Sequence, residues 1–157
     1  MTSPSYINPP RVVLPDDSDN GFVDAEMALV TIIDEIIAPI TPEANAFTLD
    51  SVPDDITDRI DRGETLISVK RVGGEADGVF DHPRMDVNVA HAYRTDAWRV
   101  MGFIRRKLLK YSGVVTNPDG TTAIVNAISD ATGPQRSFET DNSRVVTLSF
   151  SMQTRIT

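Results

Sequence analysis

The chain has 157 residues and a mass of 17.2 kDa, a size typical of one domain. Hydrophobic residues make up 40% and charged residues 24%, which excludes a collagen-like, wholly disordered or membrane-spanning protein. The most apolar stretch, residues 28–40, is interrupted by Asp34, Glu35 and Pro39, so we expect no membrane span and no membrane partner. Because the chain has no cysteine, disulfides and thiolate metal sites are excluded.

Charge is distributed unevenly along the chain. Residues 1–64 contain three basic and 14 acidic residues, a net charge of −11, whereas residues 65–157 contain 12 basic and nine acidic residues, a net charge of +3. This asymmetry indicates complementary surfaces, within one protomer or between neighbours. A general nucleic-acid binder would be basic overall, so that class is not favoured. An acidic, solvated front half remains the simpler alternative.

Residues 1–21 are predicted to form an extended, proline-rich arm, and residues 22–157 a single α+β domain. Prolines at positions 4, 9, 10 and 15 disfavour a helix and a central strand. The apolar side chains between them need a surface to cover them, on the same domain or on a neighbouring subunit. The arm residues predicted to contact another subunit are Tyr6, Ile7, Val12 and Leu14.

The first half of the domain shows one helix and one hairpin. A stripe of apolar residues predicts a helix from near Asp24 to about residue 37, ended by Pro39. Residues 41–61 are predicted to be a surface loop or short helical turn. Strands are expected at residues 65–72 and 84–92, where apolar and polar side chains alternate. Gly73 and Gly74 are expected to end the first strand, giving an antiparallel hairpin with a long tip.

The second half begins with the clearest helix of the sequence. Thr95 is its expected N-cap, Asp96 suits its first turn, and apolar residues recur at helical spacing as far as Tyr111. Strands are expected at residues 121–129 and 144–156, the last with a polar outer face. The expected order is therefore α-β-β-α-β-β, with helices packed on a mainly antiparallel sheet.

No residue pattern indicates catalysis, a cofactor or a metal. His91 is in phase with the apolar side of its strand, so a satisfied, partly buried histidine is the simplest interpretation. Asp81 and His82 with Asp86 would hold a metal only weakly, and an ordinary turn explains them better. The acidic residues between positions 50 and 61 lack EF-hand spacing. The glycines near position 74 precede a strand, so they lack the helix dipole of a phosphate site.

A cluster of basic residues lies at the end of the second helix. Complementing the helix dipole is the simplest explanation of this cluster. The alternative is a patch that faces nucleic acid or an acidic neighbouring subunit, where exposed ion pairs would guide docking more than they stabilise it. The helix residues predicted to lie in a subunit interface are Arg105, Arg106 and Lys110.

Three stretches together resemble the tail terminator proteins of long-tailed (siphovirus-type) bacteriophages, especially those infecting actinobacteria. The first is the strand at residues 65–72 closed by Gly73 and Gly74. The second is the run Pro83-Arg84-Met85-Asp86-Val87-Asn88-Val89, and the third is the helix start Thr95-Asp96-Ala97-Trp98. The similarity in motifs covers about residues 22–113, and the remainder agrees in element order.

The resemblance implies a non-enzymatic virion protein with a tail-terminator-like α+β fold. It implies a homohexameric ring that caps the tail tube at the head-proximal end of the tail. The partners implied are other copies of the chain, the tail tube protein and the head-completion or connector protein, with DNA passing through the lumen. Assembly in the host cytoplasm follows from the same resemblance.

Two other functions are compatible with the sequence. The chain could be another head–tail connector or a tail-tube component, and the length of the polymer it forms would separate these. It could instead be a small enzyme or ligand-binding domain, for which a pocket around His91 with a perturbed proton affinity would be the sign.

Overall fold

Six strands form one mixed sheet in the order β1-β2-β3-β6-β5-β4. The computed structural model describes residue 10, residues 24–131 and residues 144–155. In chain order the elements are α1 (Ala25–Ile37), β1 (Ala44–Thr48), the 3-10 turn η1 (Leu49–Ser51), α2 (Ile56–Asp61), β2 (Thr65–Ala76), β3 (Phe80–Ala90), α3 (Arg94–Leu108), β4 (Gly113–Thr116), β5 (Thr122–Asp130) and β6 (Val145–Arg155). Strand β1 runs parallel to β2 and the other pairings are antiparallel. An α+β fold is therefore confirmed; the arm, at residues 1–21, lies outside the described residues except Pro10.

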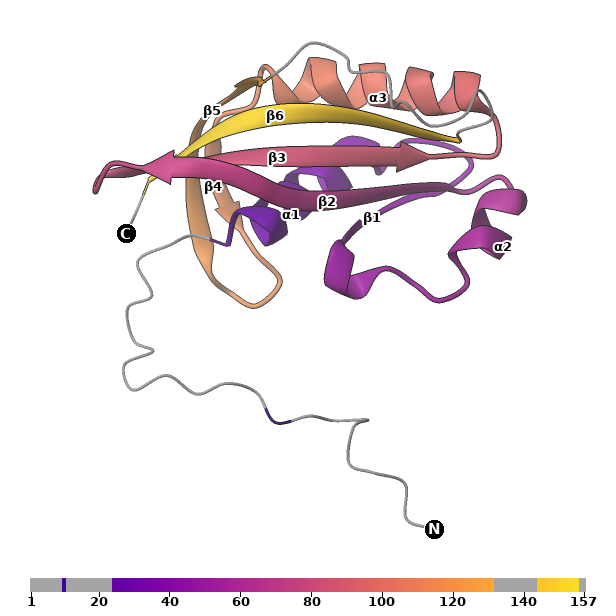
Figure 1. Cartoon of the computed structure of the whole chain (residues 1–157), viewed down its shortest axis with the longest axis horizontal. Coiled ribbons are helices and arrows are strands. Elements are labelled where there is room, and N and C mark those ends of the chain that lie inside the picture. Colours follow the sequence, from indigo (N-terminus) through magenta and orange to yellow (C-terminus); the bar gives the residue numbers. More distant parts are fainter. Residues whose placement is uncertain (1–9, 11–23, 132–143, 156–157) are drawn as a thin grey trace.

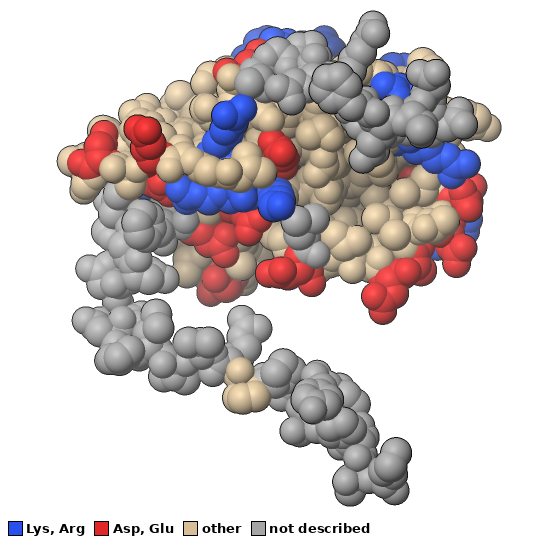
Figure 2. Space-filling model, viewed as in Figure 1, with Lys and Arg blue, Asp and Glu red and all other residues tan. Residues whose placement is uncertain are grey.

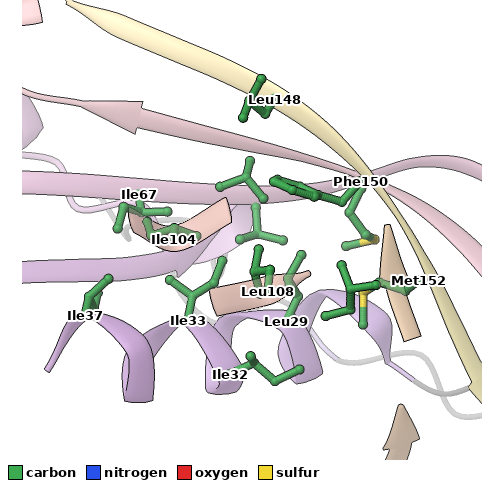
Figure 3. Close-up of a cluster of buried hydrophobic side chains, with 14 of the residues drawn as sticks. Leu29, Ile32, Ile33, Ile37, Ile67, Ile104, Leu108, Leu148, Phe150 and Met152 are labelled. Atoms are coloured by element: carbon green, nitrogen blue, oxygen red, sulfur yellow. The ribbon is translucent and has the colours of Figure 1, made fainter. Parts of the chain in front are cut away.

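Helices α1 and α3 cover the same face of the sheet and enclose the core (Figure 1). Helix α1 begins beside Asp24, as the sequence predicts. Asp24 is its N-cap rather than part of its first turn, because its carboxylate accepts a hydrogen bond from the backbone N–H of Met27 at 3.0 Å. Side chains from both helices interdigitate with those of β2 and β6 in the core (Figure 3). The largest of them are fully buried: Leu29, Ile33, Ile67, Ile104, Leu108 and Phe150.

The predicted element order is incomplete, because β1, α2 and β4 are absent from it. Residues 41–61 are not simply a surface loop, since they include β1, which pairs in register with residues 65–69 of β2. A strand of five residues that contains Ala44, Asn45 and Ala46 has little intrinsic preference for β structure, so its pairing with β2 decides its conformation. Strand β4 has four residues and α2 has six, too few for a periodic signal.

The glycine pair does not end β2. The strand continues through Gly73 and Gly74 to Ala76, with a β-bulge between Arg71 and Gly73, and β3 begins at Phe80. The hairpin tip is therefore short. Gly74 has a φ of +121°, and a Cβ there would lie 2.2 Å from the carbonyl oxygen of His82. Glycine permits both the positive φ and the close approach of the two strands.

Helix α3 also begins differently from the prediction. Its first residue is Arg94, and Tyr93 occupies the N-cap position without a capping side chain. Thr95 therefore lies inside the first turn, where Asp96 is found as expected. The buried stripe of α3 is the one predicted, Ala97, Met101, Ile104 and Leu108, so burial rather than capping determines how this helix lies on the sheet.

The opposite face of the sheet carries a ladder of polar side chains. In β6, Val146, Leu148, Phe150 and Met152 are buried in the core, and the residues between them face outward, as predicted. Across the strands, Asn88 Nδ2 donates to Ser68 Oγ at 3.2 Å, and Thr147 Oγ1 donates to Asn88 Oδ1 at 2.6 Å. At the edge of the sheet formed by β1, η1 lies beside β1 and β2 and α2 lies beside β2 (Figure 1). None of the helices in the described ranges has the length and hydrophobicity required to cross a membrane.

Candidate assembly surface

Two of the basic residues predicted as an interface, Arg105 and Arg106, lie on the outer side of α3, away from its buried stripe, and Lys110 lies in the turn that follows the helix. Arg105, Arg106 and Lys110 are all exposed. The 3.6-residue period explains this, because Ile104 and Leu108 turn toward the sheet and the residues between them face out. Cations in the last turn also complement the negative end of the helix dipole. The structure thus brings these three residues together on one surface.

Arg105 differs from its neighbours because it has a partner in its own chain. Its Nε and Nη2 donate to the carboxylate of Asp130, at the end of β5, at 3.1 and 2.6 Å. This hydrogen bond with the carboxylate, together with its charge, raises the pKa of Arg105. The carboxylate that neutralises Arg105 within the protomer therefore comes from β5 and not from the acidic first half of the chain.

Arg106 and Lys110 form no ion pair within the part of the chain that the structure describes. With Phe103 and Lys107 they line a hollow of about 300 Å³. The Nζ of Lys107 lies 5.8 Å from the centroid of the Phe103 ring, a cation–π distance. Two of the three predicted helix residues thus retain charges that a partner could neutralise.

A groove of about 570 Å³ runs beside this hollow and shares Phe103 and Arg106 with it. One wall is α3, and the other comes from the segment after α1 and from the start of β2. Apolar side chains form much of its lining, and polar groups stand along its length. The residues that line it are Ile40, Thr41, Pro42, Thr65, His91, Asp96, Trp98, Arg99, Val100, Gly102, Phe103 and Arg106.

His91 reaches this groove but is held as a structural residue. It is only 6% exposed, and its Nδ1 accepts a hydrogen bond from the backbone N–H of Tyr93 at 2.9 Å. Its backbone N–H donates to the carbonyl of Arg144 at 3.1 Å. Asp96 lies 3.9 Å from the same Nδ1, too far for a hydrogen bond. The ring therefore orients the turn before α3. Its Nδ1 already accepts a hydrogen bond, so His91 is a satisfied, buried histidine, as the sequence indicates.

The carboxylates considered as metal ligands have other roles. Asp81 binds Arg71, Asp86 accepts a hydrogen bond from Ser149 Oγ at 2.5 Å, and His82 lies 3.5 Å from Asp77. Among the described residues no group of three or more histidines or carboxylates is arranged to hold a metal. The Arg71–Asp81 pair was not foreseen, because the two residues lie on different strands that meet only once the hairpin register is known.

Acidic side chains gather at the end of the molecule opposite to Arg105, Arg106 and Lys110. Figure 2 shows them along the lower edge of the face drawn, where η1 and α2 lie. All five aspartates of this region are exposed: Asp50, Asp54, Asp55, Asp58 and Asp61. Two of them have basic neighbours, since Arg144 donates to Asp61 at 2.6 Å and Arg62 lies 3.9 Å from Asp55. The uneven charge of the sequence thus becomes two unlike surfaces.

An α+β domain with two oppositely charged ends, a grooved helix and a polar sheet face has the features of an assembly subunit. Residues 21–156 match the model of a family described as phage tail termination protein. The chain therefore belongs to the phage tail termination protein family, which makes it a structural protein of the virion tail and implies a non-enzymatic role. None of the curated proteins compared with the chain matches it.

Proposed function

We propose that copies of this chain form a closed ring, hexameric as the resemblance implies, that caps the finished tail tube at its head-proximal end. The ring joins the tail to the head-completion or connector complex, and DNA passes through its lumen. The observation that carries this proposal is the family match, which extends over residues 21–156 and so includes α1, α2, α3 and the whole sheet.

The charge distribution supports a ring. Closed cyclic symmetry with head-to-tail contacts requires two different patches on each protomer that fit one another. The exposed basic residues at the end of α3 are one such patch, and the strongly acidic first half of the chain supplies candidates for the other. Contacts of this kind contribute modestly to affinity but orient the approaching subunits.

The proposal separates termination from tube formation by the length of the product. A terminator ring stops at a fixed number of copies, whereas a tube subunit stacks without limit. Native mass spectrometry of the purified chain at increasing concentration, followed by electron microscopy, measures this directly. We expect one closed particle of fixed mass, which binds tube ends when tail tubes are added.

Two results would reject the proposal. One is a chain that stays monomeric even when tubes are present, and the other is a filament that grows with concentration. His82→Ala serves as the control, because His82 lies on β3 and does not line the groove. This variant is expected to keep particle mass and tube binding.

A further inference from the structure

Gly102 lies in the middle of α3 for no reason that the described structure of the protomer supplies. It is exposed, its φ is not positive, and a Cβ placed on it would meet nothing within 4 Å. A glycine inside a helix destabilises it by roughly 1 kcal/mol relative to alanine. Glycine at such a position permits another backbone to approach the helix closely.

Gly102 also lies where the surface hollows meet. It lines the groove described above and a second hollow of about 350 Å³ on the other side of Trp98, which Arg105 and Leu148 also line. Trp98 borders both. From Gly102 the groove leads by way of Phe103 and Arg106 into the basic hollow that contains Lys107 and Lys110. Along α3 the hollowed surface is therefore apolar near Trp98 and Phe103 and becomes basic toward Lys107 and Lys110.

One segment of this chain has the matching order of side chains. Residues 12–14 are Val-Val-Leu, Pro15 follows, and residues 16–19 are Asp-Asp-Ser-Asp. The lengths agree as well. From Trp98 to Lys107 the helix rises about 14 Å over nine residues, and four extended residues from Val12 to Asp16 span about 13 Å. Proline in this segment favours the extended backbone that such a fit needs.

We propose that residues 12–19 of one copy bind along α3 of the next copy, with Val12–Leu14 in the groove beside Trp98 and Phe103. Asp16 and Asp17 then face Arg106 and Lys110, and Gly102 allows the arm backbone to cross the helix. The inference rests on the proposed ring for a neighbouring copy, and it gives that ring a specific subunit contact. It also explains why Arg106 and Lys110, at and just after the end of α3, have no ion-pair partner among the described residues.

The absence of natural cysteines makes a direct test possible. Val13→Cys and Arg99→Cys are made in separate full-length chains that carry tags of different size, and the two chains are mixed and oxidised. Arg99 is exposed and lines the groove, so Gly102 stays unsubstituted. We expect a disulfide between the two tagged chains, seen on a non-reducing gel, in large excess over either homodimer. Thr95→Cys is the matched control, because Thr95 is exposed on the same helix but does not line the groove.

A second variant blocks the groove while sparing the fold. Gly102→Leu places a side chain in open space and improves helix propensity, so we expect thermal stability to be unchanged or higher while self-association weakens at least tenfold. Thr95→Leu adds the same side chain outside the groove and should leave self-association unchanged.

Each result has one meaning. Failure of the Val13–Arg99 crosslink, a crosslink equally strong at Thr95, or full self-association of Gly102→Leu would overturn the arm contact. So would a chain bearing both cysteines that closes only on itself and gives no crosslinked ladder. If the arm contact is overturned but the unmodified chain still forms closed rings on tube ends, the proposed function stands. If the unmodified chain does not cap tubes, the proposed function itself is rejected.

Discussion

The guanidinium of Arg71 holds the buried carboxylate of Asp81 in a two-point ion pair across the β2–β3 hairpin. Arg71 Nη1 lies 2.7 Å from Asp81 Oδ2, and Nη2 lies 2.9 Å from Oδ1. Asp81 has no exposed surface, whereas Arg71 is about one-third exposed. The hydrogen bond from Arg71 to Asp81 raises the pKa of Arg71. The backbone N–H of Arg71 also donates to Glu26 of α1 at 3.0 Å, so one residue ties the hairpin to the first helix.

Removing Arg71 should therefore destabilise the whole fold. Arg71→Ala leaves the Asp81 carboxylate buried without a counter-ion, and breaking such a pair is expected to cost roughly 3 kcal/mol of unfolding free energy, the low end of the range because Arg71 is partly exposed. Urea unfolding monitored by circular dichroism measures the change. The double variant Arg71→Met/Asp81→Leu removes both charges and should recover most of the loss. A single variant as stable as the unmodified chain would contradict this role.

The two adjacent glycines of β2 should differ sharply in their tolerance of a methyl group. Gly74→Ala forces a positive φ on alanine and brings its Cβ into the backbone of β3, so we expect a loss of at least about 2 kcal/mol. Gly73→Ala meets nothing within 4 Å and should change stability by less than about 0.5 kcal/mol. Thermal melts of both variants test the pair, and equal effects would show that the bulge geometry is wrong.

The elements with a long periodic pattern of apolar residues were predicted from the sequence. The elements whose conformation depends on pairing with a neighbouring strand were missed. The buried stripe of α3 and the alternation of β6 were correct, because each spans enough residues for its period to be read. Strand β1 was missed because its partner β2 supplies its stability, and a glycine pair that looked like a terminator proved to be part of a bulge. The exposed basic turn was visible in the sequence, but the Arg105–Asp130 pair and the groove depend on elements that meet only in the folded chain.

The hairpin tip should respond to acid through Asp77. Hydrogen bonds from the backbone N–H groups of Phe80 and Val79 lower the pKa of Asp77, and His82 adds to this. A carboxyl whose pKa is lower in the folded state stabilises the fold above its unfolded pKa, near 3.9. That contribution is lost as pH falls through the folded value.

We therefore expect Asp77→Ala to destabilise the hairpin at pH 7 and to approach the unmodified chain in stability as pH falls through the lowered pKa of folded Asp77. Hydrogen exchange of the Val79 and Phe80 amides between pH 3 and pH 7 reads the local effect. Asp77→Asn retains an oxygen acceptor but does not titrate, so it should lose the pH dependence while keeping part of the protection. A constant difference between the alanine variant and the unmodified chain at all pH values would refute the assignment.

Charge reversal on α3 should separate assembly from folding. Arg106 and Lys110 have no ion-pair partner among the described residues, so Arg106→Glu with Lys110→Glu is expected to weaken oligomers at least tenfold while leaving the melting temperature within a few degrees. Arg105→Glu places a carboxylate beside Asp130, so it should also lower stability slightly, as expected for an exposed pair. Sedimentation velocity at 50 and 500 mM salt reports the association, and the unmodified chain should weaken at high salt because screening reduces attraction between exposed charges. An unchanged particle mass in the Arg106–Lys110 double variant would mean that this end of α3 faces solvent in the assembly.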